Sequence, residues 1–558
     1  MNDKNRVSFL VKYSTLITMV LTGLTIVSQD NNYWNQMPGS RSALLGGAVV
    51  GGVRDNSAIF YNPGALSFID SSSISITANS FQYETAKVIN GGGTGVDYLS
   101  KQFQTIPLVS VSSTFKIKRF PKSTLGIMVF TKNQTSNVFS KRVDDSLSKD
   151  ILGTYDECYY YSKNPKIGYI GDFNMRTGLN ETWIGFGYSH KLNKYFSLGL
   201  TPFVAYRTQY YSKSFVSRVM LDKYSNYAQG QVTSEGYSDI SNIASSSIRL
   251  LGKFGLSIDL GNLKIGSSFT SSSYNLGGKA LISRDITYNG GLADPYSSIQ
   301  PFFGPPKDTV IYAYMYNLND KQEVIKTTFK SPASLALGLE YRLKNTTFAF
   351  SGEYFWKVDP YNFITPDSNN FYRSGNIAPS ASSPTTINSA KSNKYLKIIE
   401  ANRAVFNYGF AIEQSLSSTV ISYLNSIKLK NLNLEGITIC LSYRTDKTSF
   451  KKNSNDFWVY KYGYGDTTYT VGQRMSFSEN DIHHLNFGLT FQRQKSDLHI
   501  GFLYSYGTNN QFEALNNISD PKDNVISNNL GAVPNFSNNA EYVYKSYSIL
   551  LGYTYHLK

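Results

Sequence analysis

The chain has 558 residues and a formal net charge of +15, yet only 17% of its residues are charged while 15% are aromatic. Soluble domains of ordinary composition carry about 25% charged residues. The Lys and Arg residues are scattered rather than gathered in one block or helix, which argues against a nucleic-acid partner and favours basic turns near anionic lipid headgroups. The 43 Tyr, 34 Phe and 43 Gly residues are typical of a sheet with one apolar and one wet face.

Residues 1–28 have the pattern of a secretory signal peptide. Lys4 and Arg6 begin a positive region, and residues 13–27 follow as a mostly apolar stretch. That stretch is too short for a spanning helix, which needs about 20 residues. We place the cleavage site before Gln29. No later apolar stretch approaches spanning length, so a membrane role for the mature chain requires a β-barrel.

Residues 29–70 precede the first expected strand and show no alternation of polar and apolar residues. They contain a run of small and apolar residues at 42–53, followed by the turn sequence Asn62-Pro63-Gly64. In such a turn Pro fixes φ and Gly tolerates positive φ. The run predicts a short helix or a compact plug, and the turn sequence taken alone suits an ordinary surface turn equally well.

From residue 71 to residue 558, polar and apolar residues alternate with period two in fourteen segments. In the segment 334–343, for example, Leu335 and Leu337 oppose Ala336 and Gly338. We therefore expect an all-β fold, a transmembrane antiparallel β-barrel of about fourteen strands. The even strand number agrees with bacterial barrels. The predicted strands are 72–86, 103–118, 122–133, 181–191, 195–210, 246–260, 262–275, 330–343, 346–358, 402–415, 432–446, 483–494, 497–508 and 541–557.

The predicted connections alternate between short and long, as expected for tight periplasmic turns and large extracellular loops. The short ones lie near 119–121, 192–194, 261, 344–345 and 495–496, with 416–431 as a longer exception. The long ones are 87–102, 134–180, 211–245, 276–329, 359–401, 447–482 and 509–540. Aromatic residues near strand ends, such as Tyr341 and Tyr506, suit interfacial girdles, although aromatic residues also favour strands in general.

The strand faces predicted to point inward are mixed in character. Their charged residues are expected to pair with one another across a wet lumen. Their apolar residues either line a path for a ligand or pack against a plug, and packing is the favoured interpretation. The apolar inward residues are Met128, Phe130, Phe203, Leu251, Phe355 and Leu503.

No catalytic, cofactor or metal site is expected from the sequence, although a site assembled from distant strands stays open. His483 and His484 are neighbours on a predicted strand, so they point to opposite faces and make poor partners for one metal ion. None of the five His residues lies near a GxSxG or HExxH motif. Cys158 falls in a predicted loop and Cys440 in a predicted strand, which excludes a CxxC metal site.

The small apolar run, the segment 55–58 and the sequence Tyr61-Asn62-Pro63 occur in this order ahead of the first strand. Together they resemble the N-terminal hatch of the FadL-type outer-membrane transporters of long-chain fatty acids. The strand–turn–strand at 254–267 is also similar to that family. The chain departs from the family pattern at Gly64, where Ala is more usual, and at its C-terminus, which ends in Lys558 rather than in an aromatic residue.

The resemblance implies a barrel of residues 71–558 in the bacterial outer membrane, closed by a hatch of residues 29–70. It implies passive transport of hydrophobic compounds such as long-chain fatty acids, with Asn62, Pro63 and Gly64 fixing the hatch geometry. Phe130, Phe203 and Phe355 are the expected apolar path. FadL-like barrels also serve as accessory or surface components of protein secretion systems, and secreted proteins are then the partners. A plug argues against a general polar porin.

Overall fold

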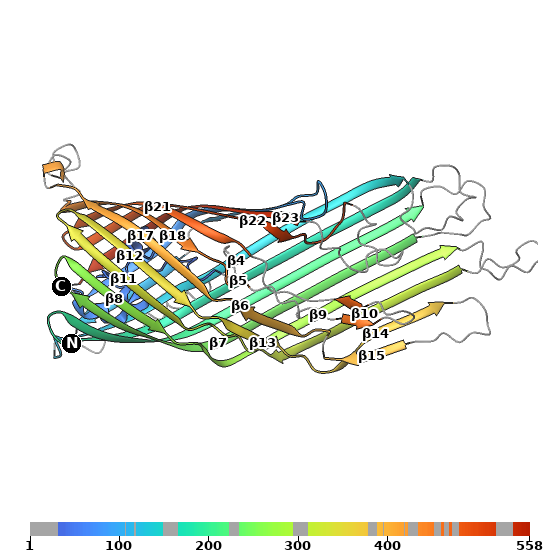
Figure 1. Ribbon diagram of the computed structural model, residues 1–558, viewed down its shortest axis with the longest axis horizontal. Helices are drawn as coiled ribbons and strands as arrows, with labels where there is room; N and C mark the ends of the chain where they lie inside the picture. The colour runs from blue at the N-terminus through green and yellow to red at the C-terminus, as the bar shows by residue number, and fades with distance from the viewer. Residues whose placement is uncertain are drawn as a thin grey trace, which may run out of the picture.

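The computed structural model describes residues 32–557, without 106–107, 117–118, 149–165, 222–233, 294–310, 378–387, 394, 418, 422–433, 451–458, 462–467, 471–478 and 520–538. The predicted signal peptide and Cys158 lie outside the described residues. Within that part of the chain, no helix is long and apolar enough to cross a membrane. The chain instead forms one closed antiparallel β-barrel (Figure 1).

Fourteen strands form the closed ring, each paired with the next and the last with the first. The strands in ring order are β1 (Ser73–Ile89), β3 (Leu108–Lys116), β4 (Ser123–Ser148), β5 (Lys166–Lys191), β6 (Phe196–Leu221), β7 (Ser234–Asp259), β8 (Leu263–Thr270), β11 (Ser334–Leu343), β12 (Thr346–Phe355), β17 (Val405–Ser415), β18 (Gly436–Asp446), β21 (Asp481–Arg493), β22 (Ser496–Glu513) and β23 (Asn539–His556). The predicted fold class and strand number are therefore confirmed.

Short turns gather at one end of the barrel, which we call the turn end, and the opposite end is the loop end. The turns after β3, β5, β7, β11 and β21 lie where the sequence predicts them. One boundary is wrong, because the predicted strand 103–118 is two strands, β2 (Tyr98–Thr105) and β3. β2 pairs with the loop-end half of β1 and β3 pairs with its turn-end half.

The wall rises beyond the fourteen-strand belt on one side (Figure 1). β4, β5, β6 and β7 are 26 residues each, far longer than the 9–11 residues that cross a membrane. β9 (Tyr274–Ala293) and β10 (Ile311–Lys326) continue this wall, followed by β14 (Asn369–Ile377) and β15 (Asn388–Ser392). Four small strands complete the described structure: β13 (Val358–Ile364), β16 (Ile398–Asn402), β19 (Val459–Lys461) and β20 (Thr468–Thr470).

The interpretation of 134–180, 211–245, 276–329 and 359–401 as loops is thus wrong for much of their length. Above the membrane the outer face of a strand meets water, so both faces carry polar residues and the apolar alternation disappears. In β4, for example, Thr135 and Asn137 point inward and are buried, while Ser136 and Ser140 lie on the outer face.

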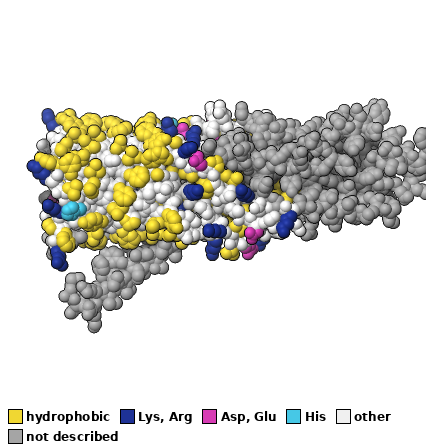
Figure 2. All heavy atoms as spheres, turned by 60° about the horizontal axis from the view of Figure 1, so that its bottom comes forward, with side chains coloured by type: hydrophobic (Ala, Val, Ile, Leu, Met, Phe, Trp, Pro, Cys, Tyr) yellow, Lys and Arg dark blue, Asp and Glu magenta, His cyan; other side chains and the backbone are white. Residues whose placement is uncertain are grey.

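The turn-end half of the barrel is apolar on the outside, whereas its inner face carries both polar and apolar residues. In β11, Leu335, Leu337 and Leu339 are exposed, whereas Ala336 and Glu340 are buried. The same inversion recurs around the ring, and Figure 2 shows the resulting apolar belt on the face turned to the viewer. A closed barrel with such a belt is the architecture of a bacterial outer-membrane protein.

The described residues before β1 lie within the ring at its turn end (Figure 1). They form two short α-helices, α2 (Ser40–Leu44) and α3 (Ala58–Tyr61), and a 3-10 helix η1 (Pro63–Phe68). We call residues 32–70 the inner segment. Its apolar side chains are buried together with inward residues of the barrel wall, and a separate apolar cluster lies toward the loop end.

Candidate functional site

The inner segment is hydrogen-bonded to strands around the whole ring. The Ser40 hydroxyl lies 2.8 Å from the Thr77 hydroxyl of β1, and Ser442 of β18 donates to the Leu44 carbonyl at 2.7 Å. On the opposite side, Ser189 of β5 donates to the Gly64 carbonyl at 2.9 Å. These contacts tie the inner segment to walls on opposite sides of the barrel.

Asn62 joins the inner segment to itself and to the wall. Its side-chain nitrogen donates to the Val50 carbonyl at 3.0 Å and to the Leu256 carbonyl of β7 at 2.9 Å. Its side-chain oxygen accepts from the Gly64 N–H at 3.1 Å. Pro63 opens η1, where the absence of an N–H costs nothing. Asn62 is fully buried, so each of these bonds would leave an unpaired buried group if it were removed.

Four inward glycines on adjacent strands let the inner segment approach the wall backbone. Gly199 pairs with Gly255 across β6 and β7, and Gly266 pairs with Gly338 across β8 and β11. A Cβ on any of them would overlap backbone or side-chain atoms of residues 50–51 or 62–64. We call these four wall residues the glycine strip. Gly64 of the inner segment also lies close to the strip, since a Cβ on Gly64 would lie 2.8 Å from the Gly255 carbonyl oxygen.

Two ion pairs add to this attachment near the turn end. Arg41 donates two hydrogen bonds to Glu413 of β17, at 3.0 and 2.5 Å. Arg54 lies 2.9 Å from Asp259 of β7. Because these side chains are partly shielded from solvent, the pairs are stronger than exposed surface pairs.

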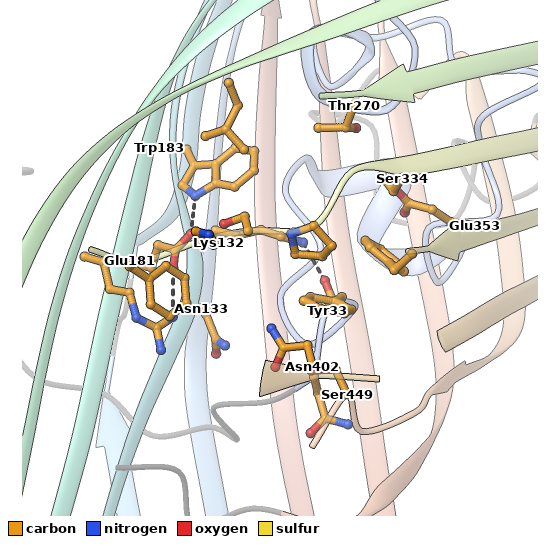
Figure 3. Close-up of a pocket in the computed structure, with 18 of the residues that line it drawn as sticks. Tyr33, Lys132, Asn133, Glu181, Trp183, Thr270, Ser334, Glu353, Asn402 and Ser449 are labelled. Carbon is orange, nitrogen blue, oxygen red and sulfur yellow. Dashed lines mark hydrogen bonds and ion pairs between the residues drawn. The ribbon is translucent and has the colours of Figure 1, made fainter. Parts of the chain in front are cut away.

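Above the inner segment lies a cavity of about 90 Å³, large enough for several water molecules or part of a ligand chain (Figure 3). It is enclosed by the inner segment, the walls of β4 to β7 and β12, and the residues that precede β11. Its apolar lining comes from Phe60, Trp183, Leu251, Phe329 and Phe355.

An aromatic cluster forms the floor of the cavity. Phe60 of α3 contacts Phe130 of β4 at a ring-centroid distance of 4.9 Å, and Trp183 of β5 contacts Phe203 of β6 at 5.3 Å. On the other side Tyr33 stacks on Phe355 with centroids 4.3 Å apart. Offset and edge-to-face arrangements of this kind add to the stability gained from burial alone.

The cavity is lined by the carboxylates of Glu181, Glu353 and Glu400, of which the first two are held by the following close partners. Glu181 is bound by Arg207 at 3.0 Å and by Arg249 at 2.8 Å, and it accepts from the Trp183 indole at 2.6 Å. Glu353 accepts from the Trp34 indole at 2.7 Å and from a Ser hydroxyl of β11. Glu181 therefore has two cationic partners, whereas Glu353 is held by neutral hydrogen-bond donors.

Two lysines of the cavity are bound differently. Lys132 donates to the Tyr33 carbonyl at 2.5 Å, a contact drawn in Figure 3, and Lys253 lies 4.6 Å from the centre of the Phe60 ring. Lys132 approaches the same ring to 5.1 Å. Among the residues that the structure describes, neither ammonium group lies within ion-pair distance of a carboxylate. The cavity thus combines an apolar floor with two cations that have no paired anion.

Of the three residues expected to form an apolar path, Phe355 lines the cavity. Phe130 and Phe203 are buried and contact Phe60 and Trp183 instead. Their role in transport stays a prediction. The sequence interpretation missed Phe60 and Trp183, although Trp183 has the inward parity of its strand and could have been found from it.

In the described part of the chain no three His, Cys, Asp or Glu side chains are grouped to hold a metal ion. Cys440 is buried in β18, as its strand placement predicts. His484 points inward and His483 outward, as expected for neighbours on a strand.

No protein-family model and no curated protein matches this chain. Solved structures that are similar include a Pseudomonas aeruginosa FadL homologue, with 12% identity, coverage of 96% of this chain and 100% of that one, and a TM-score of 0.46. The P. putida toluene transporter TodX shares 11% identity over 93% of this chain and 98% of its own, with a TM-score of 0.45. The Ralstonia pickettii toluene transporter TbuX shares 10% identity over 93% and 98%, with a TM-score of 0.42.

Proposed function

We propose that the protein carries hydrophobic acids, such as long-chain fatty acids, passively across the outer membrane. One observation supports this most directly: a plugged barrel holds a cavity whose floor is aromatic and whose lysines, Lys132 and Lys253, lack a carboxylate partner among the described residues. An acyl chain would lie against Phe60 and Trp183, where burial of apolar surface is favourable. Its carboxylate would balance the two ammonium charges.

In this proposal the inner segment is the hatch and must shift for the ligand to pass. The hydrogen bonds of Asn62 and the contacts of Gly64 with the glycine strip fix the closed position. The ion pairs of Arg41 and Arg54 hold the same segment near the turn end. A plug attached by several separable contacts can move without unfolding the barrel, because the strand ladder does not depend on it.

The first test is uptake of a labelled long-chain fatty acid by cells with and without the protein. Protein-dependent uptake is the expected result. Unchanged uptake, with the protein shown to be in the outer membrane, would contradict the proposal for fatty acids.

A second test concerns the acid group and uses the single variant Lys253→Gln. We expect it to reduce fatty-acid uptake while leaving the folded barrel intact, because it removes a cavity charge that forms no ion pair. The matched control is Lys279→Gln, which changes an exposed lysine of β9 outside the cavity. Equal uptake by both variants would show that Lys253 does not bind the ligand's acid group.

A further inference from the structure

The exposed cations at the turn end form a distinct group. They lie on or beside the turns after β3, β5, β11 and β21, and none belongs to the cavity or to the inner segment. Within the described residues, no carboxylate lies within ion-pair distance of any of them. We call six of them the basic collar: Arg119, Lys122, Lys194, Lys344, Arg493 and Lys495; Lys116 and Arg342 are exposed beside the same turns.

The charges at the loop end are arranged differently. There, some exposed cations are paired with nearby acids, as in Lys87 with Asp97 at 2.7 Å and Arg142 with Asp144 at 2.9 Å, whereas others, such as Lys101 and Lys279, have no ion pair among the described residues. At the turn end, the exposed carboxylates among the described residues are limited to Asp70 and Glu435. The turn end therefore presents an excess of positive charge that the protein itself does not neutralise.

The collar borders the apolar belt. Arg119 lies 5.9 Å from the ring of Phe120, and Lys194 lies 4.6 Å from the ring of Tyr195. Both rings are exposed, as is Leu343 next to Lys344. Figure 2 shows Lys and Arg side chains along this edge of the belt. Apolar groups beside cations belong at the depth where acyl chains give way to headgroups.

We propose that the basic collar binds anionic phospholipid headgroups of the membrane leaflet that faces the turn end. Charge complementarity supports this assignment, because six unpaired cations lie at headgroup depth. An anionic phosphate group with no compensating amine would neutralise them there. Basic side chains near an anionic lipid surface each contribute about fivefold to binding. The collar selects which lipids surround the protein and does not depend on the transport proposal.

The test is lipid selection by the purified, folded barrel in bilayer discs made from equal amounts of phosphatidylglycerol and phosphatidylethanolamine. The lipids retained after transfer to detergent are counted by native mass spectrometry. We expect phosphatidylglycerol to be enriched on the wild-type barrel. The collar variant should lose this enrichment by about fivefold or more. That variant carries Arg119→Gln, Lys122→Gln, Lys194→Gln, Lys344→Gln and Lys495→Gln.

A control variant removes the same number of positive charges by replacing exposed lysines on strands toward the loop end. It carries Lys101→Gln, Lys141→Gln, Lys279→Gln, Lys326→Gln and Lys391→Gln. We expect it to keep the enrichment of the wild-type barrel. Equal enrichment in the collar variant and the wild type would overturn the proposal, as would an equal loss in both variants, which would reflect net charge alone. Heat-modifiable gel migration establishes that every variant compared is a folded barrel.

Discussion

Single residues decide how closely the inner segment approaches the barrel wall. Gly255 leaves room for the Asn62 side chain, and Asn62 uses that proximity to reach the Leu256 carbonyl. Asn62 and Gly255 lie 193 positions apart in the chain. The sequence motif Asn62-Pro63-Gly64 could therefore predict a turn but not the strand that it contacts. In the sequence, the glycines of the contacted strands appear only as small residues on the inward face and do not indicate a contact with the inner segment.

Replacing Gly255 by Ala should loosen the inner segment, because the added Cβ would overlap Asn62 and Gly64. Overpacking of this kind costs about 1–3 kcal/mol. We expect faster hydrogen exchange in residues 40–66 and a higher ion conductance in planar bilayers. The control is Gly252→Ala on the same strand, where a Cβ would meet its nearest neighbour at 3.8 Å. If both variants conduct like the wild type, the glycine strip does not seat the segment.

The double variant Asn62→Ala with Pro63→Ala should leave the barrel folded and change transport. It removes the Asn62 bonds to the Val50 and Leu256 carbonyls, and an acceptor left buried and unpaired costs about 1–3 kcal/mol. Heat-modifiable migration would check the fold, and fatty-acid uptake would measure the function. Uptake equal to the wild type would count against a hatch role for this turn.

The outer face of a long strand meets lipid along one part of its length and water along the other. The turn-end part of β5 faces lipid with Phe186, which is 54% exposed, whereas its loop-end part buries Phe173 against Tyr98 with ring centroids 4.9 Å apart. The period-two pattern predicts the first part because lipid demands apolar residues on one face. The second part has polar residues on its outer face, so the sequence alone suggests a loop.

The extension of β4 to β7 should be an ordered unit that can be destabilised apart from the membrane barrel. Phe173→Ala would open a cavity in the loop-end cluster, at a cost of about 3–5 kcal/mol. We expect thermolysin to cleave the extension faster while the gel migration of the barrel stays unchanged. Phe186→Ala on the same strand is the control, since that ring faces lipid. Unaltered cleavage of the Phe173 variant would contradict an ordered core outside the membrane.

The whole molecule is polarised along the barrel axis. One end has short turns, the basic collar and the inner segment, and the other has the extended wall and its own apolar cluster. In outer-membrane barrels the short turns face the periplasm and the long connections face the outside. The same arrangement places the collar and the turn end of the inner segment toward the periplasm, with the cavity on the outer side of the inner segment.

This orientation predicts opposite labelling of two exposed lysines replaced by cysteine. In a Cys158→Ser background, Lys141→Cys on β4 should react with a membrane-impermeant maleimide in intact cells. Lys194→Cys at the turn end should react only after the outer membrane is permeabilised. Cys440 is fully buried and should stay unlabelled in both samples. Labelling of Lys194→Cys alone in intact cells would reverse the assigned orientation.

The sequence by itself determined the fourteen strands, the short turns and the outward direction of the apolar residues. It could do so because lipid on one side and a wet lumen on the other impose period two on every membrane-spanning segment. Only the tertiary structure decided which residues meet inside. Phe60, Trp183, Lys132 and Lys253 come from four separate elements, and they form one site because ring closure brings distant strands around a common plug. A local pattern records the solvent on each side of a strand, but it carries no information on which distant strand lies across the lumen.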